Sequence, residues 1–251
     1  IDVENSAVML EAMKIAAKKG IIVSCHSEDM TLDQLAKPYR QKALAIMKEN
    51  DIDPTDFGMH DTETSDSFEN EKILKAYYSI DEVLGKANKI LAVAENVATE
   101  RNLELAKAAR CPVHIAHVST AEAIYAIQRF KEEYPSLKIS CEVTPHHLFF
   151  DGESQPMIRA LVNPPLRTPL DISELILAIK NGVVDVISTD HAPHTVKDKA
   201  NGAPGFPGLE TAYGACNCVL VKEVGLSPCL LSKLMSANPA KILGLNKGLL
   251  K

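Results

Sequence analysis

The run Asp190-His191-Ala192-Pro193-His194 comes directly after an apolar stretch of valines and isoleucine. Residues 183–189 have the character of a buried strand, so Asp190 and His194 lie where a strand opens into a loop. In a barrel of parallel strands, catalytic groups collect at this rim. A carboxylate placed there can bind a metal ion and can also accept a proton. The segment therefore indicates metal binding, proton transfer or both.

Two histidines hold equivalent positions, because His26 and His117 each end a predicted strand, over 21–25 and 112–117. The ends of neighbouring barrel strands converge on the barrel axis, which brings both histidines towards Asp190. Two neutral imidazoles and a carboxylate suit Zn²⁺, which takes nitrogen and oxygen ligands. For any one histidine, a hydrogen-bonded structural role is the alternative. The coincidence of all three positions is what supports a metal site.

The remaining histidines near these strands fit supporting roles better. His114 lies three residues before His117, and strand alternation places the two on opposite faces, so we expect His114 to be structural. His146 and His147 are adjacent, so at most one faces the site, and His147 is a candidate for holding other groups in place. His191 points away from Asp190 and is expected to pack within its loop.

Three loops offer groups that could contact a substrate. His194 can donate a hydrogen bond to a carboxylate. Asn163 precedes two prolines in Asn-Pro-Pro-Leu-Arg, which fix the backbone while the amide offers both donor and acceptor; a plain turn is the alternative. In the segment 203–211, glycine would let backbone groups near Pro204 and Gly205 approach a ligand closely.

Strand and helix patterns alternate, which predicts βα units and a parallel sheet. Four strands emerge, over 21–25, 112–117, 138–143 and 183–189. An eight-stranded TIM-type (β/α)8 barrel needs twice as many, so the fold class predicted is α/β, with residues 1–251 forming roughly the C-terminal half of one barrel domain. Residues 31–85 are polar and irregular around 51–70, and we interpret them as a long, partly helical insertion.

The predicted helices have recognisable ends. Asn5 or Ser6 begins the first, and Gly20 ends it. A helix over 87–109 is followed by one over 123–130, which a capping box from Ser119 to Glu122 would open. Asp171 is expected to cap a further helix, and the Asn238-Pro239 pair to begin the last.

Composition narrows the function classes. The chain has 251 residues, 46% of them hydrophobic and 24% charged, which is typical of a globular domain. A net charge of −6 without a basic cluster argues against nucleic acid or an anionic membrane as partner. Its six cysteines form no disulfide framework, which favours the cytoplasm, and Cys216 and Cys218 are interpreted as two helical thiols rather than a metal motif. A start at Ile1 leads us to expect further residues upstream.

Taken together, these segments resemble dihydroorotases of the amidohydrolase superfamily. The matching segments follow the family's order and cover most of the chain outside 31–85: Val23 to Asp29, His117 to Thr120, Glu142 to Leu148, Asn163 to Arg167, Ser188 to His194, and Ala203 to Thr211. Hydantoinases and allantoinases share the metal histidines, but the Asn-Pro-Pro-Leu-Arg and Asp-His-Ala-Pro-His forms look like dihydroorotase.

The resemblance implies one or two Zn²⁺ ions, with His26, His117 and Asp190 as ligands and Asp190 also as the proton carrier. It implies Asn163, His194 and the backbone of Pro204 and Gly205 as substrate contacts. The implied reaction is the reversible cyclisation of N-carbamoyl-L-aspartate to L-dihydroorotate in pyrimidine biosynthesis. The partners to consider are a second copy of the chain or a transcarbamoylase.

Three family features have no counterpart in the chain. They are the His-x-His motif of the first barrel strand with its nearby arginine, the bridging carbamoylated lysine or aspartate of the fourth strand, and the small β-domain. We expect them before Ile1 or beyond Lys251, so the 251 residues alone are expected to form an incomplete site. The alternatives are a hydantoinase or allantoinase acting on another cyclic amide, and a non-catalytic scaffold subunit.

Overall fold

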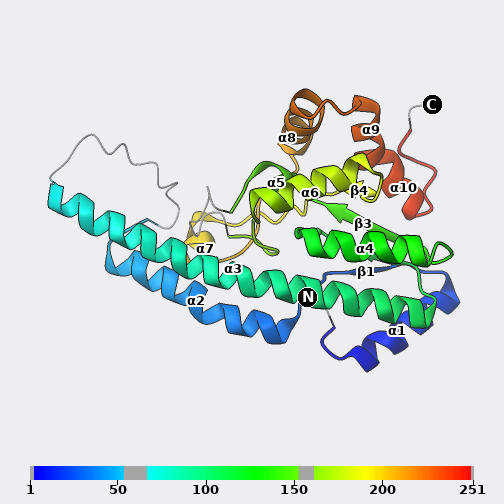
Figure 1. Ribbon diagram of the computed structural model, residues 1–251, viewed down its shortest axis with the longest axis horizontal. Helices are drawn as coiled ribbons and strands as arrows, with labels where there is room; N and C mark the ends of the chain where they lie inside the picture. Colours follow the sequence, from blue (N-terminus) through cyan, green and yellow to red (C-terminus); the bar gives the residue numbers. More distant parts are fainter. Residues whose placement is uncertain (1–2, 54–66, 153–160, 250–251) are drawn as a thin grey trace.

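The structure is a computed structural model that describes residues 3–53, 67–152 and 161–249. A parallel sheet of four strands lies at its centre, in the order β1-β2-β3-β4 (Figure 1). The strands are β1 (Val23–Cys25), β2 (Val113–Ile115), β3 (Ile139–Val143) and β4 (Val186–Ile187). All four predicted strands and their parallel arrangement are confirmed, and each is shorter than expected.

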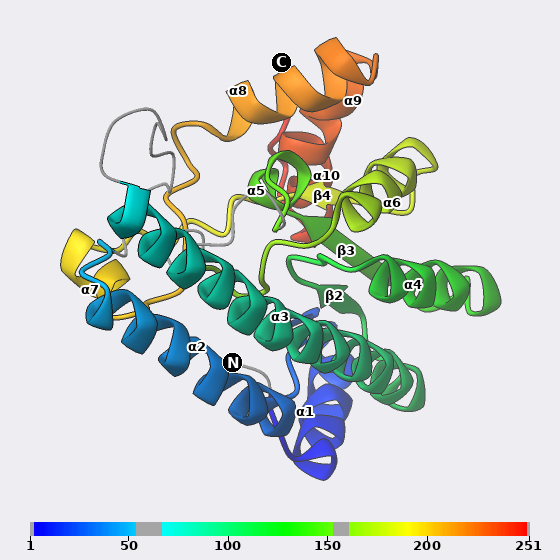
Figure 2. The ribbon, with the colours of Figure 1, turned by 60° about the vertical axis from the view of Figure 1, so that its left-hand side comes forward.

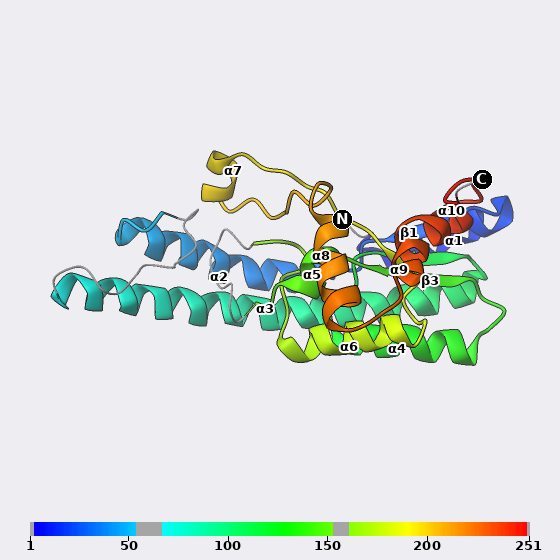
Figure 3. The same ribbon diagram turned by 90° about the horizontal axis from the view of Figure 1, so that it is seen from above.

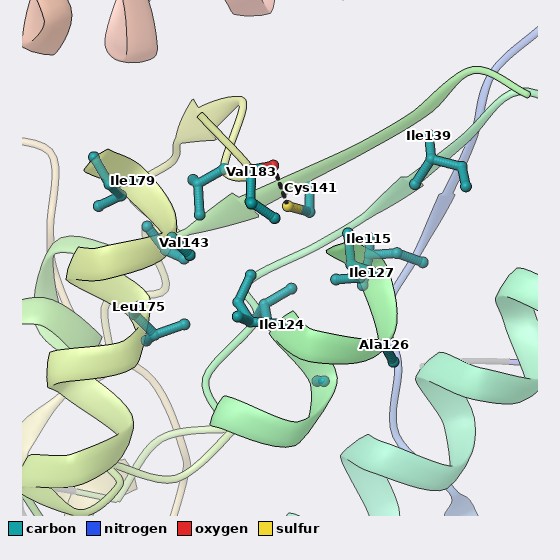
Figure 4. Packing of buried hydrophobic residues seen from close by; sticks show 14 of the residues in the cluster. Ile115, Ile124, Ala126, Ile127, Ile139, Cys141, Val143, Leu175, Ile179 and Val183 are labelled. Atoms are coloured by element: carbon teal, nitrogen blue, oxygen red, sulfur yellow. Dashed lines mark hydrogen bonds between the residues drawn. The ribbon is translucent and has the colours of Figure 1, made fainter. Parts of the chain in front are cut away.

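A layer of helices covers one face of this sheet. Four helices pack side by side in the order α1 (Ser6–Lys19), α3 (Ser67–Ala109), α4 (Ala121–Glu133) and α6 (Pro169–Lys180). Figure 3 shows the last three on the same side of the sheet. Strand residues such as Ile115, Cys141 and Val143 meet apolar residues of α4 and α6 (Figure 4). Burial of this apolar surface is the main stabilising term of the fold.

Polar side chains occupy the opposite face of the sheet. Ser24, His114 and Ser140 are neighbours in the strand register, and Glu142 follows on the same face. The His114 ring lies between the Ser140 hydroxyl, at 2.8 Å from Nδ1, and the Glu142 carboxylate, at 3.0 Å from Nε2. His114 therefore has the structural role expected of it.

Two of the predicted helix starts are corrected. The Asn5 side chain caps α1 and Gly20 ends it with φ 66°, as expected. The cap of α4 is Thr120 rather than Ser119, whose hydroxyl is instead bonded to Glu95. The cap of α6 is Thr168, and Asp171 forms a capping box with it from the third helical position. Both errors arise because several adjacent residues could cap, and tertiary contacts decide which one does.

The expected insertion contains a helical arm, which we define as α2 (Met30–Glu49) with the first half of α3. The helix predicted from residue 87 begins twenty residues earlier, at Ser67. Two small cores join α2 to α3, and their fully buried members include Ala43, Ile80 and Ala87. Figure 1 shows the arm extending beyond the sheet. The helical period of the arm is hard to recognise in the sequence, because the segment is polar and α2 contains Pro38.

Short helices complete the chain. After β3 comes α5 (Pro145–Phe149), and after β4 come α7 (Val196–Ala200) and α8 (Ala212–Cys216). A run of helical segments closes the described chain: η2 (Asn217–Glu223), α9 (Pro228–Ser232), η3 (Lys233–Ala237) and α10 (Asn238–Ile242). The last helix begins at Asn238 as predicted. Among the residues described, no helix is long and apolar enough to cross a membrane.

Candidate functional site

Two imidazole rings from neighbouring strand ends face each other. His26 follows β1 and His117 follows β2, and parallel pairing of these strands brings both to the same edge of the sheet. The Nδ1 atom of His26 lies 2.6 Å from the Nε2 atom of His117, with the rings at 76° to one another. The structure thus brings together two of the three predicted metal ligands.

A carboxylate behind His26 orients its ring. The Oε2 atom of Glu28 lies 3.1 Å from His26 Nε2. Burial disfavours the charged form of Glu28, but the hydrogen bond with His26 and nearby positive charge outweigh it, so the pKa of Glu28 lies below its ordinary value. An ionised carboxylate only accepts hydrogen bonds, so His26 Nε2 carries the proton and its Nδ1 lone pair faces His117. This carboxylate–histidine arrangement is typical of zinc sites.

The donor set fits zinc in its chemistry. Two nitrogens bound to one tetrahedral Zn²⁺ would lie about 3.3 Å apart, from bond lengths of about 2.0–2.1 Å. The rings are closer than this and form a direct hydrogen bond, so they would separate by under ~1 Å to admit the ion. Burial, and then the charge of His26, lower the pKa of His117, which favours the neutral form that ligates metals. The buried Nδ1 atom of His117 has no hydrogen-bond partner.

The backbone at two predicted ligands has an uncommon conformation. His117 has φ 34° and Asp190 has φ 46°, in the left-handed region that side-chain-bearing residues rarely adopt. Such residues concentrate at functional sites, where surrounding contacts hold them. The Oε1 atom of Glu142 accepts a hydrogen bond from the His117 amide at 3.4 Å, while its other oxygen meets His114. Glu142 therefore links the polar face of the sheet to the end of β2.

Asp190 lies close enough to His117 for its charge to favour the protonated imidazole, and it follows β4 at the same edge of the sheet. It does not complete a ligand group in this conformation. In the described part of the chain, no three His, Cys, Asp or Glu side chains are placed to hold one metal ion.

The loop that contains Pro204 and Gly205 is attached to the segment after β4. Ala192 donates its amide to the Phe206 carbonyl at 2.9 Å, and His191 Nδ1 accepts from the amides of Gly208 and Leu209. Gly205 has φ 141°, and a Cβ there would lie 2.6 Å from the Ala192 carbonyl oxygen. His191 therefore has the packing role expected of it, and glycine is required for this approach.

Internal hydrogen bonds already occupy the backbone groups of this loop. His194 donates from Nε2 to the Pro204 carbonyl at 2.8 Å. The Gly205 amide donates to the Leu161 carbonyl, and the Gly205 carbonyl accepts from Lys199 Nζ. For the backbone of Pro204 or Gly205 to contact a substrate, these internal hydrogen bonds would have to break and be replaced by hydrogen bonds to the substrate. With Nε2 donating, His194 must be doubly protonated to donate from Nδ1 as well.

His147 supports the Asn163 loop rather than a ligand. It is buried, with Nδ1 2.7 Å from the Thr144 hydroxyl and Nε2 3.0 Å from the Pro164 carbonyl oxygen. Burial lowers its pKa to about 3, although the Pro164 carbonyl favours the protonated ring. The Oδ1 atom of Asn163 is buried and has no hydrogen-bond partner. An acceptor of this kind is suited to a ligand that brings its own donor.

A buried ion pair joins three elements around the site. Arg167, at the end of the Asn163 loop, donates from Nη2 to Glu95 of α3 at 2.9 Å and from Nε to the Ser119 hydroxyl at 2.9 Å. Glu95 accepts the amides of Ser119 and Thr120 at 2.7 and 3.2 Å. Both charged side chains are about 5% exposed or less. The loop after His117 is thereby fixed to α3 and to the Asn163 loop.

Sequence reasoning missed this ion pair and the role of Glu142. One signal was present for Glu95: together with Thr99 and Asn102, it lies on the apolar stripe of α3, where a polar residue must find a buried partner. Cys216 and Cys218 are two helical thiols, as interpreted. Burial raises the pKa of Cys216 to about 12, which disfavours the metal-binding thiolate.

Comparison with known proteins shows extensive similarity. No protein-family model matches the chain. The chain is 50% identical over 158 residues to a dihydroorotase of Clostridium botulinum, covering 63% of this chain and 38% of that protein. It is 34% identical over 254 residues to a dihydroorotase of Elusimicrobium minutum, covering 99% of this chain and 50% of that protein. The chain thus spans about half the length of the curated relatives it matches.

Solved structures confirm the fold. An L-hydantoinase from Arthrobacter aurescens superimposes with a TM-score of 0.74 at 24% identity, over 100% of this chain and 50% of that one. A dihydropyrimidinase from Brevibacillus agri gives a TM-score of 0.70 at 21% identity, over 98% and 49% of the two chains. The predicted half of a TIM-type amidohydrolase barrel is therefore confirmed.

Replacing Arg167 should test the buried ion pair. Arg167→Met leaves the Glu95 charge buried without its cation, so the free energy of unfolding should fall by about 3–5 kcal/mol. The control is Arg129→Met, which removes a half-exposed pair with Glu100 and should cost under ~1 kcal/mol. Urea unfolding followed by circular dichroism measures both, and equal losses would contradict the assigned importance of the pair.

His147 should make stability fall in mild acid. The unfolded chain binds a proton at the ordinary histidine pKa of 6.5, whereas the folded protein excludes it until about 3. Between these values the unfolded state binds more protons, so the free energy of unfolding should decrease by up to about 1.4 kcal/mol per pH unit as pH falls. Urea unfolding of His147→Gln should show a shallower dependence on pH than the wild type. An unchanged slope in His147→Gln would refute this.

Proposed function

Because the chain is a dihydroorotase-like amidohydrolase, we propose that it provides part of the active site of a zinc-dependent dihydroorotase. The proposed reaction is the reversible cyclisation of N-carbamoyl-L-aspartate to L-dihydroorotate. The observation that supports it most is the pair of facing imidazoles at adjacent strand ends, 2.6 Å apart, with Glu28 aligned behind one of them. In metal sites, a carboxylate that hydrogen-bonds to a ligating imidazole fixes the tautomer and the orientation of the ring, and Glu28 is placed to do this for His26.

In this proposal His26 Nδ1, His117 Nε2 and Asp190 would hold zinc. Bound Zn²⁺ would supply Lewis-acid chemistry, polarising the ring amide carbonyl and making water more acidic. In the hydrolytic direction, in which the ring of L-dihydroorotate opens, the Asp190 carboxylate would take the proton from the attacking water and pass it to the ring nitrogen as the carbon–nitrogen bond breaks. Its position after β4, at the edge of the sheet where His26 and His117 also lie, supports this role.

Asn163 and His194 would position the substrate. Asn163 offers a buried amide oxygen that is free to accept a donor from the ring or from the carbamoyl group. His194, once doubly protonated, would donate to the substrate carboxylate while remaining attached to the Pro204 carbonyl. Fixing the carboxylate and the amide together orients the reacting carbon, which accelerates the reaction without new covalent chemistry. Contacts with Pro204 and Gly205 would follow a rearrangement of their loop.

Two other functions remain to be distinguished. Hydantoinases share the fold, but the solved structures that match are under 25% identical and bear on the fold alone. The curated relatives at 32–50% identity that we compared are named dihydroorotases, which favours that substrate. A non-catalytic scaffold would have no need for an oriented histidine pair. Six free cysteines support the cytoplasm as the compartment, where a transcarbamoylase or a second copy would be the partner.

Zinc binding tests the proposed ligands directly. Elemental analysis after equilibrium dialysis of the 251-residue chain should find bound zinc that His117→Asn removes. Glu28→Gln should weaken zinc binding by about tenfold to a hundredfold, because it loses the carboxylate that orients His26. His114→Asn is the matched control, since His114 lies on the same strand but outside the pair. Zinc retained in full by His117→Asn would eliminate the site.

Turnover tests the reaction. L-Dihydroorotate, hydantoin and allantoin are assayed side by side with a zinc-loaded longer chain that also contains the family's His-x-His segment and bridging ligand, and we expect turnover of L-dihydroorotate alone. Asp190→Asn should keep zinc with modestly weaker affinity and lose nearly all turnover, because the amide cannot carry the proton. Turnover of only the other two substrates would favour a hydantoinase or allantoinase. No turnover of any substrate would favour the scaffold.

A further inference from the structure

A pocket opens between α5 and α8. Helix α5 packs against α8, which lies above it in Figures 1 and 2. The pocket has a volume of about 520 Å³. Its described lining comes from α5 and the residue that follows it, from the loop at 206–208, and from four residues between 211 and 218. None of the predicted zinc ligands or substrate contacts is among these lining residues, so the pocket is a second candidate site.

Aromatic rings form one wall of the pocket. Phe149 and Phe150 are 46% and 38% exposed, with ring centroids 4.9 Å apart and planes at 80°. The Phe206 ring lies 6.3 Å from the Phe150 ring, at 29°, and 5.2 Å from the His146 ring. A ligand that covers these rings would remove apolar surface from water, which is favourable.

Small residues form the wall on the α8 side. Gly214 and Ala215 line the pocket, and a Cβ on Gly214 would meet no atom within 4 Å. The wall beside Gly214 is therefore open to a ligand. Thr211 lines the pocket as well, and its side chain forms no capping hydrogen bond with α8. The Thr211 hydroxyl can therefore bond with a polar group of a ligand, because the helix does not use it.

The described wall of the pocket carries no charge. Its lining residues include no Asp, Glu, Lys or Arg. Burial, and then the charges of His147 and His117, lower the pKa of His146 to about 2, so its ring is neutral near pH 7. A hydrogen bond with Glu223 raises the pKa of the Cys218 thiol, which keeps this group protonated. A charged ligand would lose hydration here without gaining an ion pair.

We propose that this pocket binds an uncharged, planar aromatic molecule, which packs against Phe149, Phe150 and Phe206 and forms a hydrogen bond with Thr211. Sites for small molecules typically have volumes of about 300–1,000 Å³ and apolar or aromatic walls with few polar groups. The pocket has each of these properties. Stacked and edge-to-face contacts between aromatic rings add to the gain from burial alone. Binding here does not require zinc, so the inference goes beyond the proposed function and is independent of it.

Fluorescence titration of the 251-residue chain with 2-naphthol tests the site, because a chain without tryptophan contributes little fluorescence of its own. We expect saturable binding. Gly214→Leu should weaken it by about tenfold or more, because the new side chain fills the pocket, and Gly214→Ala should weaken it less. Gly85→Leu is the matched control and should not change the affinity. Gly85 also lies within a helix and has no atom within 4 Å of an added Cβ, but it is outside the pocket. Neither leucine should lower the unfolding midpoint, because glycine weakens a helix.

Further measurements test the class of ligand. Charged 2-naphthoate should bind at least about tenfold more weakly than 2-naphthol, because its carboxylate loses hydration. Decahydro-2-naphthol keeps the hydroxyl but lacks aromatic rings, so it should compete about threefold to tenfold more weakly. Thr211→Val keeps the shape of the side chain and removes its hydroxyl, which should weaken 2-naphthol binding about twofold to tenfold.

Several outcomes would overturn the inference. A wild type without saturable 2-naphthol binding, or a Gly214→Leu variant that binds as tightly as the wild type, eliminates the site. Equal affinities for 2-naphthol, 2-naphthoate and decahydro-2-naphthol eliminate the assigned class of ligand. An excess of L-dihydroorotate should leave 2-naphthol bound, and its displacement would make the pocket part of the substrate site. Neither zinc binding nor turnover enters these measurements, so their failure leaves the proposed function standing.

Discussion

The ion pair between Glu95 and Arg167 is the constraint on which the site depends. Each partner is buried, and each satisfies backbone or hydroxyl groups of a different segment, so neither can be neutralised without leaving several groups unpaired. The loop after His117 cannot shift without breaking bonds to Glu95, and Arg167 holds the end of the Asn163 loop in the same network. A buried pair of this kind adds little net stability over an apolar core, and its value lies in specifying one arrangement of the loops.

Around that network, the strand ends combine rigidity with uncommon backbone geometry. His117 and Asp190 adopt positive φ, and a conformation of that kind persists only where its surroundings determine it. The carboxylate of Glu142 supports His117 by accepting a hydrogen bond from the His117 amide. Asp190 is supported by the hydrogen bond between the following segment and the loop at Phe206. Short strands suit this arrangement, because β2 and β4 end early enough for the chain to turn its side chains towards the common edge.

Much of this could be predicted from local patterns, and the remainder depended on contacts between distant segments. Alternating apolar runs located every strand, and the histidines were found because they follow those runs directly. The tautomer of His26 and the support from Glu142 were beyond prediction, since each depends on a partner brought close only by folding. The first half of α3 was missed because its exposed face is highly charged, although Ala76, Ile80, Val83 and Ala87 keep a helical period on the buried face. Asp171 was correctly predicted to lie at the start of a helix, but it is the third helical residue and Thr168 is the cap.

Helix α3 runs without interruption from the tip of the arm to the turn before β2. At 1.5 Å per residue, its 43 residues form a rod of about 65 Å. One end packs on α2, the middle supplies Glu95, and the other end leads into β2, the strand that precedes His117. One continuous helix therefore joins the arm to the edge of the sheet, so tilting its outer end would strain the hydrogen bonds that anchor the loops at Glu95.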